Sequence, residues 1–155
     1  LPVPRGGAFA VIRLCVWFLA DFALWAAVRW DAKALGAMAL AFVLERCLSG
    51  LAIATFPLAK DTGLAHTFAA ASDKKRVRGI LGAASAGLAL GLALWGGLAG
   101  AAMVVAAGLA LWRYHQVAKK QFGGITGDLA GWFLQRTELW MLAALAAVQL
   151  MEGRI

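Results

Sequence analysis

Charged residues are scarce in this sequence. Only 15% of its 155 residues are Asp, Glu, Lys or Arg, whereas about 25% is usual in a soluble domain. Residues of the AVILMFWYC set make up 63%, which is more apolar surface than a soluble core of this size could bury. The same composition excludes an intrinsically disordered chain, because disorder requires low hydrophobicity. The sequence therefore predicts an integral membrane protein.

Cysteine and acidic residues are also few. The two cysteines, Cys15 and Cys47, lie within apolar stretches without the spacing of a disulfide framework or a metal site, so we interpret them as small apolar residues. Basic residues outnumber acidic ones by 15 to 8, an excess that would suggest nucleic acid in a soluble protein. Because this excess lies between apolar runs, we expect it to contact membrane lipids and expect no nucleic acid partner.

Five apolar segments can be drawn along the chain. A membrane-spanning helix needs about 20 apolar residues, and the segments cover residues 8–28, 34–56, two spans within 79–112, and 128–151. Gly96 and Gly97 predict the turn inside 79–112, and Gly82, Gly87 and Gly91 favour close helix packing. The predicted fold is all-α: a polytopic helical membrane protein with about five transmembrane helices, forming a single domain over residues 1–155.

Basic residues between the spans predict the orientation. Nine Lys and Arg lie on the side of the N-terminus and of the polar stretches 60–78 and 113–127, against three on the other side. The positive-inside rule then places the N-terminus and both stretches in the cytoplasm. His66 and His115 lie in these stretches without metal-ligand spacing, so we expect both to be solvated.

A few charged side chains fall inside the predicted spans, where they are costly and need a partner or a polar interior. Asp21 in the first span could pair with Arg13 or with a neighbouring helix. Glu45 and Arg46 are adjacent and leave a helix about 100° apart. We therefore expect at least one of them to serve another helix or a ligand, with structural pairing and function equally open for Arg46.

The start of the last span is the most informative stretch. A glycine-rich turn enters a helix near Asp128, with Thr126 as its predicted N-cap, and free amides at such a start favour a phosphate. Asp128, Gly131, Gln135 and Glu138 fall within an arc of about 80° and form one polar stripe. A carboxylate beside a phosphate makes chemical sense when a divalent cation bridges the two. A plain helix cap with polar residues facing the bundle explains the same pattern.

These residues resemble the C-terminal half of the cobalamin synthase family, also called adenosylcobinamide-GDP ribazoletransferase. The family's glycine–threonine–glycine–aspartate motif, followed by a glycine and glutamates, is matched by Gly123-Gly124-Ile125-Thr126-Gly127-Asp128, Gly131 and Glu138, with Gln135 where glutamate is common. Arg46 and Lys60-Asp61-Thr62-Gly63-Leu64 resemble a second family pattern, with lysine where arginine is common. The resemblance covers residues 6–151, and its specific part is 123–138.

The resemblance implies a membrane transferase of cobalamin biosynthesis in a bacterial or archaeal cytoplasmic membrane. Such an enzyme joins adenosylcobinamide-GDP to α-ribazole or its 5′-phosphate and releases GMP, with Mg²⁺ as cofactor. It implies Asp128 as a metal ligand and catalytic residue, together with Glu138 and Arg46. The implied substrate-binding residues are Lys60, Gly123, Gly124, Thr126, Gly127, Gly131 and Gln135. Among the catalytic and substrate-binding residues together, Arg46 and Lys60 would neutralise the pyrophosphate. A homo-oligomer is also compatible with the resemblance.

The sequence departs from the family near its beginning. The family's aspartate-rich motif, thought to hold Mg²⁺, has no match here, and residues 1–5 resemble the family's extreme N-terminus. We therefore expect a missing segment between Arg5 and Gly6, with a naturally shortened, inactive homologue as the alternative. Three other classes stay open: a small transporter or channel subunit, a non-catalytic membrane scaffold, and a lipid-type phosphotransferase. Flux across sealed vesicles would indicate the first, and absence of nucleotide and Mg²⁺ binding the second.

Overall fold

The computed structural model describes residues 7–56 and 73–153, without the side chains of residues 121 and 122. In chain order the elements are α1 (Ala8–Ala27), α2 (Ala32–Thr55), α4 (Lys74–Gly96), α5 (Leu98–Val117), the π-helical turn η1 (Ala118–Phe122) and α6 (Gly127–Met151). These described ranges contain helices and no β-sheet, so the predicted all-α class is confirmed. The proposed junction between Arg5 and Gly6 lies outside the described residues and stays a prediction.

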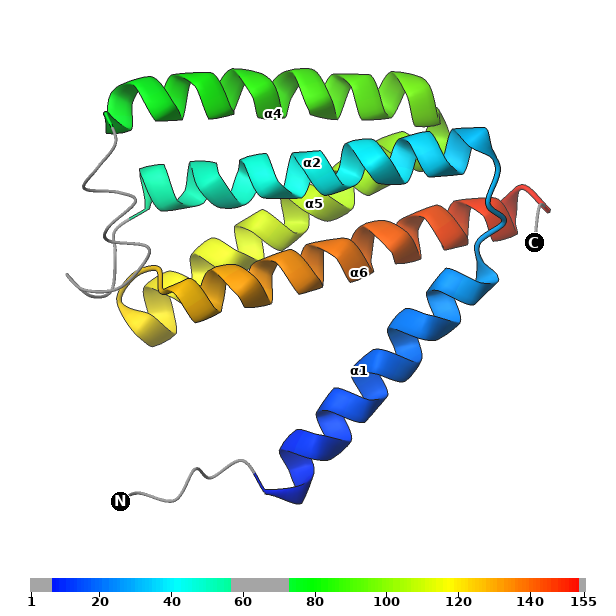
Figure 1. Cartoon of the computed structure of the whole chain (residues 1–155), viewed down its shortest axis with the longest axis horizontal. Helices are drawn as coiled ribbons and strands as arrows, with labels where there is room; N and C mark the ends of the chain where they lie inside the picture. The colour runs from blue at the N-terminus through cyan, green and yellow to red at the C-terminus, as the bar shows by residue number, and fades with distance from the viewer. Residues whose placement is uncertain (1–6, 57–72, 154–155) are drawn as a thin grey trace.

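Four helices in the described part are long and apolar enough to cross a membrane: α1, α2, α4, and α5 with the start of η1. Their bounds agree with four of the five expected spans to within a few residues, except that α4 and α5 extend beyond 79–112. The fifth, α6, has 25 residues and carries Gln135, Arg136 and Glu138 near its middle. Figure 1 shows α6 in the same bundle as α2, α4 and α5.

The bundle is built from neighbouring antiparallel helices. α2 packs mainly on α4, and α5 packs mainly on α6. α1 slants away from the other helices in Figure 1 and contacts chiefly α6. Near its C-terminal end it is held by Gln149 of α6, which accepts a hydrogen bond from the backbone N–H of Arg29 and donates one to its carbonyl, at 2.9 and 3.0 Å. The N-terminal part of α1 is consequently open on most sides.

Side-chain caps define the starts of α2, α4 and α6, and the first two are formed by aspartates. The Asp31 carboxylate accepts from the N–H of Ala34 at 2.8 Å, and the Asp73 carboxylate accepts from the N–H of Lys75 at 3.1 Å. Such caps stabilise a helix by about 1 kcal/mol each. The Arg78 guanidinium near the start of α4 also donates to the carbonyl of Ala54 at 3.0 Å, which joins the start of α4 to the end of α2.

The predicted turn at Gly96 and Gly97 is confirmed. Gly97 has φ 59° and separates α4 from α5, a backbone conformation that glycine adopts without steric cost. The expectation for Gly82, Gly87 and Gly91 is wrong, because a Cβ at any of them would meet no described neighbour within 4 Å. The close approach occurs elsewhere: at Gly100, a Cβ would overlap the carbonyl of Leu92.

The polar stretch 113–127 is more ordered than its composition suggests. α5 continues to Val117, and η1 adds a π-helical turn to Phe122. Gly123 then reverses the chain with φ 66°, again a conformation suited to glycine. As a result, one end of the bundle in Figure 1 holds the end of α2 and of α5 together with the starts of α4 and α6.

Replacing Gly100 by Ala tests the contact between α4 and α5. The added methyl group collides with backbone that cannot move independently, so we expect the free energy of unfolding to fall by about 1–3 kcal/mol, as for other overpacked sites. Gly108→Ala, in the same helix but facing open space, is the matched control and should be neutral or slightly stabilising. Reversible unfolding in mixed detergent micelles measures both. Equal stability of the two variants would contradict the close contact.

Candidate functional site

The start of α6 has the geometry expected from its sequence. The Thr126 hydroxyl accepts a hydrogen bond from the N–H of Leu129 at 3.2 Å, so the predicted N-cap is confirmed. Asp128 lies in the first turn and is exposed. The N–H groups of Gly127 and Asp128 belong to this first turn, where no intrahelical acceptor is available. With the helix dipole, they make this end of the bundle suitable for an anion.

The structure gives Gly123 and Gly124 a different role from the predicted one. Both N–H groups donate to the carbonyl of Ala118, the one from Gly124 at 3.0 Å. They close the π-helical turn and are therefore already used as donors. A phosphate held by these two amides would have to compete with those hydrogen bonds, and their role in phosphate binding stays a prediction. The remaining donors are the amides at the start of α6.

A cavity of about 200 Å³ opens beside this turn, lined by Phe56, His115, Ala118, Lys119, Gly123 and Gly124. The expectation that His115 is a solvated loop residue is wrong: it lies in α5, is half-buried, and its ring centroid is 4.5 Å from that of Phe56. The sequence offered no signal for this, because periodicity did not extend α5 past Trp112. Lys60 and His66, which were also expected near this end, lie outside the described residues.

The described residues do not by themselves form a complete metal site. No group of three His, Cys, Asp or Glu side chains within ranges 7–56 and 73–153 lies close enough together to hold an ion. Mg²⁺ is commonly bound through one or two carboxylates together with substrate phosphates and water. Asp128 fits the role of one such carboxylate.

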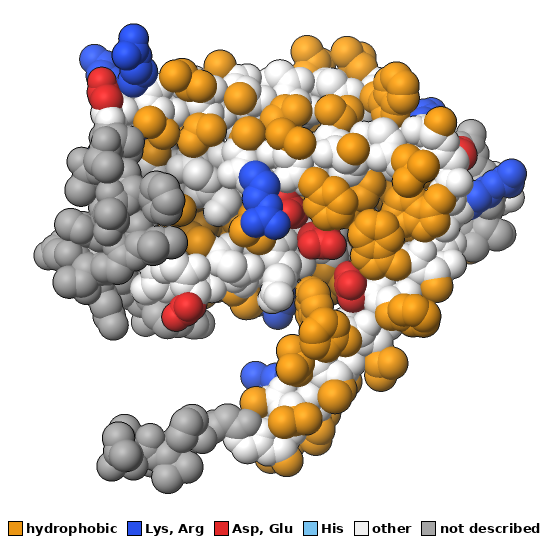
Figure 2. Space-filling model, viewed as in Figure 1, with side chains coloured by type: hydrophobic (Ala, Val, Ile, Leu, Met, Phe, Trp, Pro, Cys, Tyr) orange, Lys and Arg blue, Asp and Glu red, His pale blue; other side chains and the backbone are white. Residues whose placement is uncertain are grey.

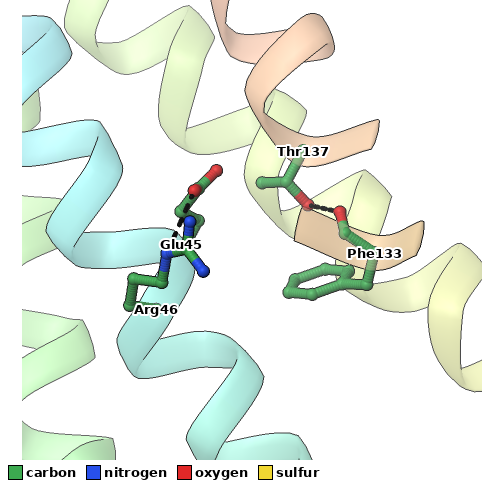
Figure 3. A network of polar contacts seen from close by, with 4 residues as sticks. All are labelled: Glu45, Arg46, Phe133 and Thr137. Atoms are coloured by element: carbon green, nitrogen blue, oxygen red, sulfur yellow. Dashed lines mark hydrogen bonds and ion pairs between the residues drawn. The ribbon is translucent and has the colours of Figure 1, made fainter. Parts of the chain in front are cut away.

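A second polar group lies midway along the bundle. Arg46 Nε is 3.6 Å from Glu45 Oε1, and the two side chains differ sharply in exposure, 67% for Arg46 and 0% for Glu45. Figure 3 shows Glu45 and Arg46 on α2, with the Thr137 hydroxyl of α6 donating to the carbonyl of Phe133 at 2.7 Å. Glu45 and Arg46 therefore form an ion pair although they leave α2 about 100° apart. The pairing does not satisfy Glu45 fully, because neither of its oxygens has a hydrogen-bond donor in the described part of the chain.

Two further carboxylates belong to this mid-bundle group. Glu138 of α6 interacts electrostatically with Asp21 of α1 and with Arg46, and Glu45 interacts with Glu138. Asp21 forms no ion pair with Arg13 among the described residues, and its buried Oδ1 has no hydrogen-bond partner there. Figure 2 shows acidic and basic side chains gathered between apolar ones where α1, α2 and α6 meet. Three carboxylates are thus coupled in one group, in which Arg46 interacts with Glu45 and Glu138.

Asp128 and the mid-bundle group are separate places. Asp128 and Glu138 are ten positions apart along α6, a rise of about 15 Å. Gly131 and Gln135 are exposed between them, and a Cβ at Gly131 would meet nothing in the described structure. The structure therefore brings Arg46 and Glu138 together but does not bring Asp128 to them. The site predicted from the sequence omitted Asp21 and Glu45. Their charge within a predicted span was the sequence feature that could have indicated them.

Fold and site together define a multi-pass helical membrane protein with an anion-compatible helix start at one end and a charged group at mid-span. The chain belongs to the cobalamin-5-phosphate synthase family, whose model matches residues 3–146. The family resemblance seen in residues 6–151 is thereby confirmed.

Curated relatives agree with this assignment. The adenosylcobinamide-GDP ribazoletransferase of Lachnoclostridium phytofermentans is 38% identical over 152 residues, which cover 98% of this chain and 56% of that protein. The enzyme of the same name from Pseudomonas aeruginosa is 35% identical over 144 residues, covering 92% of this chain and 56% of the relative. The chain thus spans somewhat more than half the length of these relatives. No solved structure matches it.

Removing the Thr126 hydroxyl tests the helix start. Thr126→Ala deletes the acceptor for Leu129, so we expect the first turn of α6 to lose about 1 kcal/mol, whereas Thr126→Ser keeps the hydroxyl and the cap. Amide hydrogen exchange of residues 127–130 in micelles measures this locally. The Ala variant should exchange several-fold faster and the Ser variant at the original rate. Equal protection in all three proteins would show that the Thr126 hydroxyl does not stabilise the start of α6.

A single variant and a double variant test the mid-bundle ion pair. Arg46→Met removes the guanidinium that pairs with the buried Glu45 carboxylate, and we expect the free energy of unfolding to fall by about 1–3 kcal/mol, between the values for exposed and buried pairs. Glu45→Gln/Arg46→Met leaves no unpaired charge on α2 and should recover most of that loss. Unfolding in mixed micelles measures both. A double variant as unstable as Arg46→Met would contradict the pairing.

Proposed function

We propose that this chain carries the C-terminal part of the catalytic machinery of an adenosylcobinamide-GDP ribazoletransferase. The proposed reaction joins adenosylcobinamide-GDP to α-ribazole or its 5′-phosphate and releases GMP. The observation that carries the proposal is the start of α6, where a glycine-closed turn and the Thr126 cap present free amides beside the Asp128 carboxylate. Family membership supports the same reaction.

The chemistry required is phosphoryl transfer. An alcohol oxygen of the ribazole attacks a phosphorus atom of the diphosphate, the new P–O bond forms, the bond to the leaving GMP breaks, and the alcohol proton passes to water. Mg²⁺, when bound, offsets the negative charge on the phosphates. In our proposal the amides of Gly127 and Asp128 orient a phosphate, Asp128 contributes one metal ligand, and Thr126 holds the turn in place.

Arg46 and Glu138 have a different role in this proposal from that of Asp128. Because they lie about 15 Å deeper along the helices, they cannot contact a phosphate bound at the start of α6. We assign them to polar contacts with a more distant part of the large corrinoid substrate. Neutralisation of the diphosphate then falls to basic residues at the end of the bundle, among which Lys60 remains a sequence-based proposal.

The proposed location is a bacterial or archaeal cytoplasmic membrane. The positive-inside rule puts the starts of α4 and α6 and the end of α5 on the cytoplasmic side, where a nucleotide-activated substrate is available. A homo-oligomer is compatible with the exposed apolar surface of the helices but has no contact that identifies it.

Asp128→Asn tests the proposed site. In the membrane-embedded full-length protein, supplied with adenosylcobinamide-GDP, α-ribazole and Mg²⁺, we expect GMP release to fall at least 100-fold, by about 2.7 kcal/mol of transition-state stabilisation or more. The reason is that an amide keeps the shape of the side chain but loses its charge for a metal ion. Asp73→Asn is the matched control: it lies at the same end of the bundle, and Asn retains its capping function at α4.

Two results would contradict the proposal. Near-normal GMP release by Asp128→Asn would remove Asp128 from the site. A complete protein that neither releases GMP nor binds nucleotide or Mg²⁺ would instead favour a membrane scaffold, and ion or solute flux in sealed vesicles would favour a transporter subunit.

A further inference from the structure

A basic groove lies at the end of α5, and no residue of the start of α6 lines it. It has a volume of about 320 Å³ and is lined by Trp112, Arg113, Gln116, Val117 and Lys120. Arg113 and Lys120 are exposed, and neither pairs with an acid among the described residues. The groove therefore presents two uncompensated cations and the side-chain amide of Gln116.

An apolar track continues from this groove along the same helix. Val105, Leu109 and Trp112 follow the spacing i, i+4, i+7 and lie on one face, which Gln116 extends by a further turn. All three apolar side chains are more than half exposed, at 61%, 52% and 62%. In a membrane this face meets acyl chains.

We expect the groove to lie near the depth of lipid headgroups, because it is formed at the end of a membrane-spanning helix. α5 has 20 residues, which corresponds to about 30 Å of helix, the thickness of the hydrocarbon core. Trp112 lies near one end of this length, where tryptophan is enriched in membrane proteins. Beyond it the chain turns basic, with Arg113, Lys119 and Lys120. Basic pockets at this level suit anionic headgroups, and each cation near the surface strengthens such binding.

We propose that this groove binds the phosphate of an anionic phospholipid, whose acyl chain lies along Val105, Leu109 and Trp112. Arg113 and Lys120 donate charge-assisted hydrogen bonds to the phosphate oxygens, and Gln116 donates to the headgroup. A lipid suits the observations better than a free phosphate ion, because the cations continue directly into an exposed apolar track that an inorganic ion cannot use. The lipid proposal does not rest on the proposed transfer reaction, since no residue of the start of α6 lines the groove.

Native mass spectrometry of the purified chain in detergent, supplied with equal amounts of phosphatidylglycerol and phosphatidylcholine, tests this site. We expect preferential retention of phosphatidylglycerol by the unchanged protein. Arg113→Gln and Lys120→Gln should each lower that preference about five-fold, the effect of one cation near the surface. Lys119→Gln is the matched control: it removes the same charge from the adjacent position, but Lys119 lines the other cavity, so the preference should persist.

Further arms separate the lipid from other occupants. Excess inorganic phosphate should leave phosphatidylglycerol bound, and helix content measured by circular dichroism should be the same in all variants. Displacement by inorganic phosphate would reduce the groove to a simple anion site and overturn the proposal. An equal loss in Lys119→Gln would show non-specific attraction and also overturn it. Retention of a second copy of the chain without any lipid would assign the apolar track to a dimer instead.

Discussion

The cost of charge in an apolar surrounding is the constraint on which the rest of this structure depends. A charged side chain at the centre of a membrane helix costs about 3 kcal/mol on insertion scales. This chain nevertheless keeps Asp21, Glu45, Arg46 and Glu138 at similar depth on three helices. Within the described part of the chain, Glu45 is the only one of the three carboxylates that forms an ion pair, with Arg46 at 3.6 Å. Such an excess of acid is retained most readily where a ligand or another polar group is to be bound.

The bundle separates this charged group from the surface chemistry at its end. Helix pairs α2–α4 and α5–α6 bring one set of helix ends together (Figure 1), and there the chain places the caps of α4 and α6 and the π-helical turn. Most of the basic residues in the described part lie there as well. The amides of Gly123 and Gly124 donate hydrogen bonds within the turn. The donors that remain available for an anion are therefore the first-turn amides of α6. A site for phosphates at this end and a polar group about 15 Å deeper together suit a substrate that is both charged and large.

Sequence reasoning reached the elements whose physics is local. The turn at Gly97, the Thr126 cap and the helix bounds follow from backbone conformation and hydrogen bonding within a few residues. It did not reach the extension of α5, because Arg113, Tyr114 and His115 interrupt the apolar pattern although they are compatible with a helix. Tyr114 is fully buried and stacks on Phe133 of α6, with ring centroids 4.7 Å apart. This tertiary contact, invisible in the local pattern, accounts for the additional turn.

The amino-acid sequence by itself determined the membrane class, the helical architecture, the family and the glycine-to-aspartate motif, because composition, apolar run length and motif spacing are properties of the chain alone. Only the tertiary structure decided which polar residues meet. It placed Arg46 and Glu138 with Asp21 and Glu45, kept Asp128 apart from them, and turned Gly100 rather than Gly82, Gly87 or Gly91 towards a neighbouring backbone. The physical reason is that such encounters depend on the rotation and depth of whole helices, which are set by packing between helices and not by any one segment.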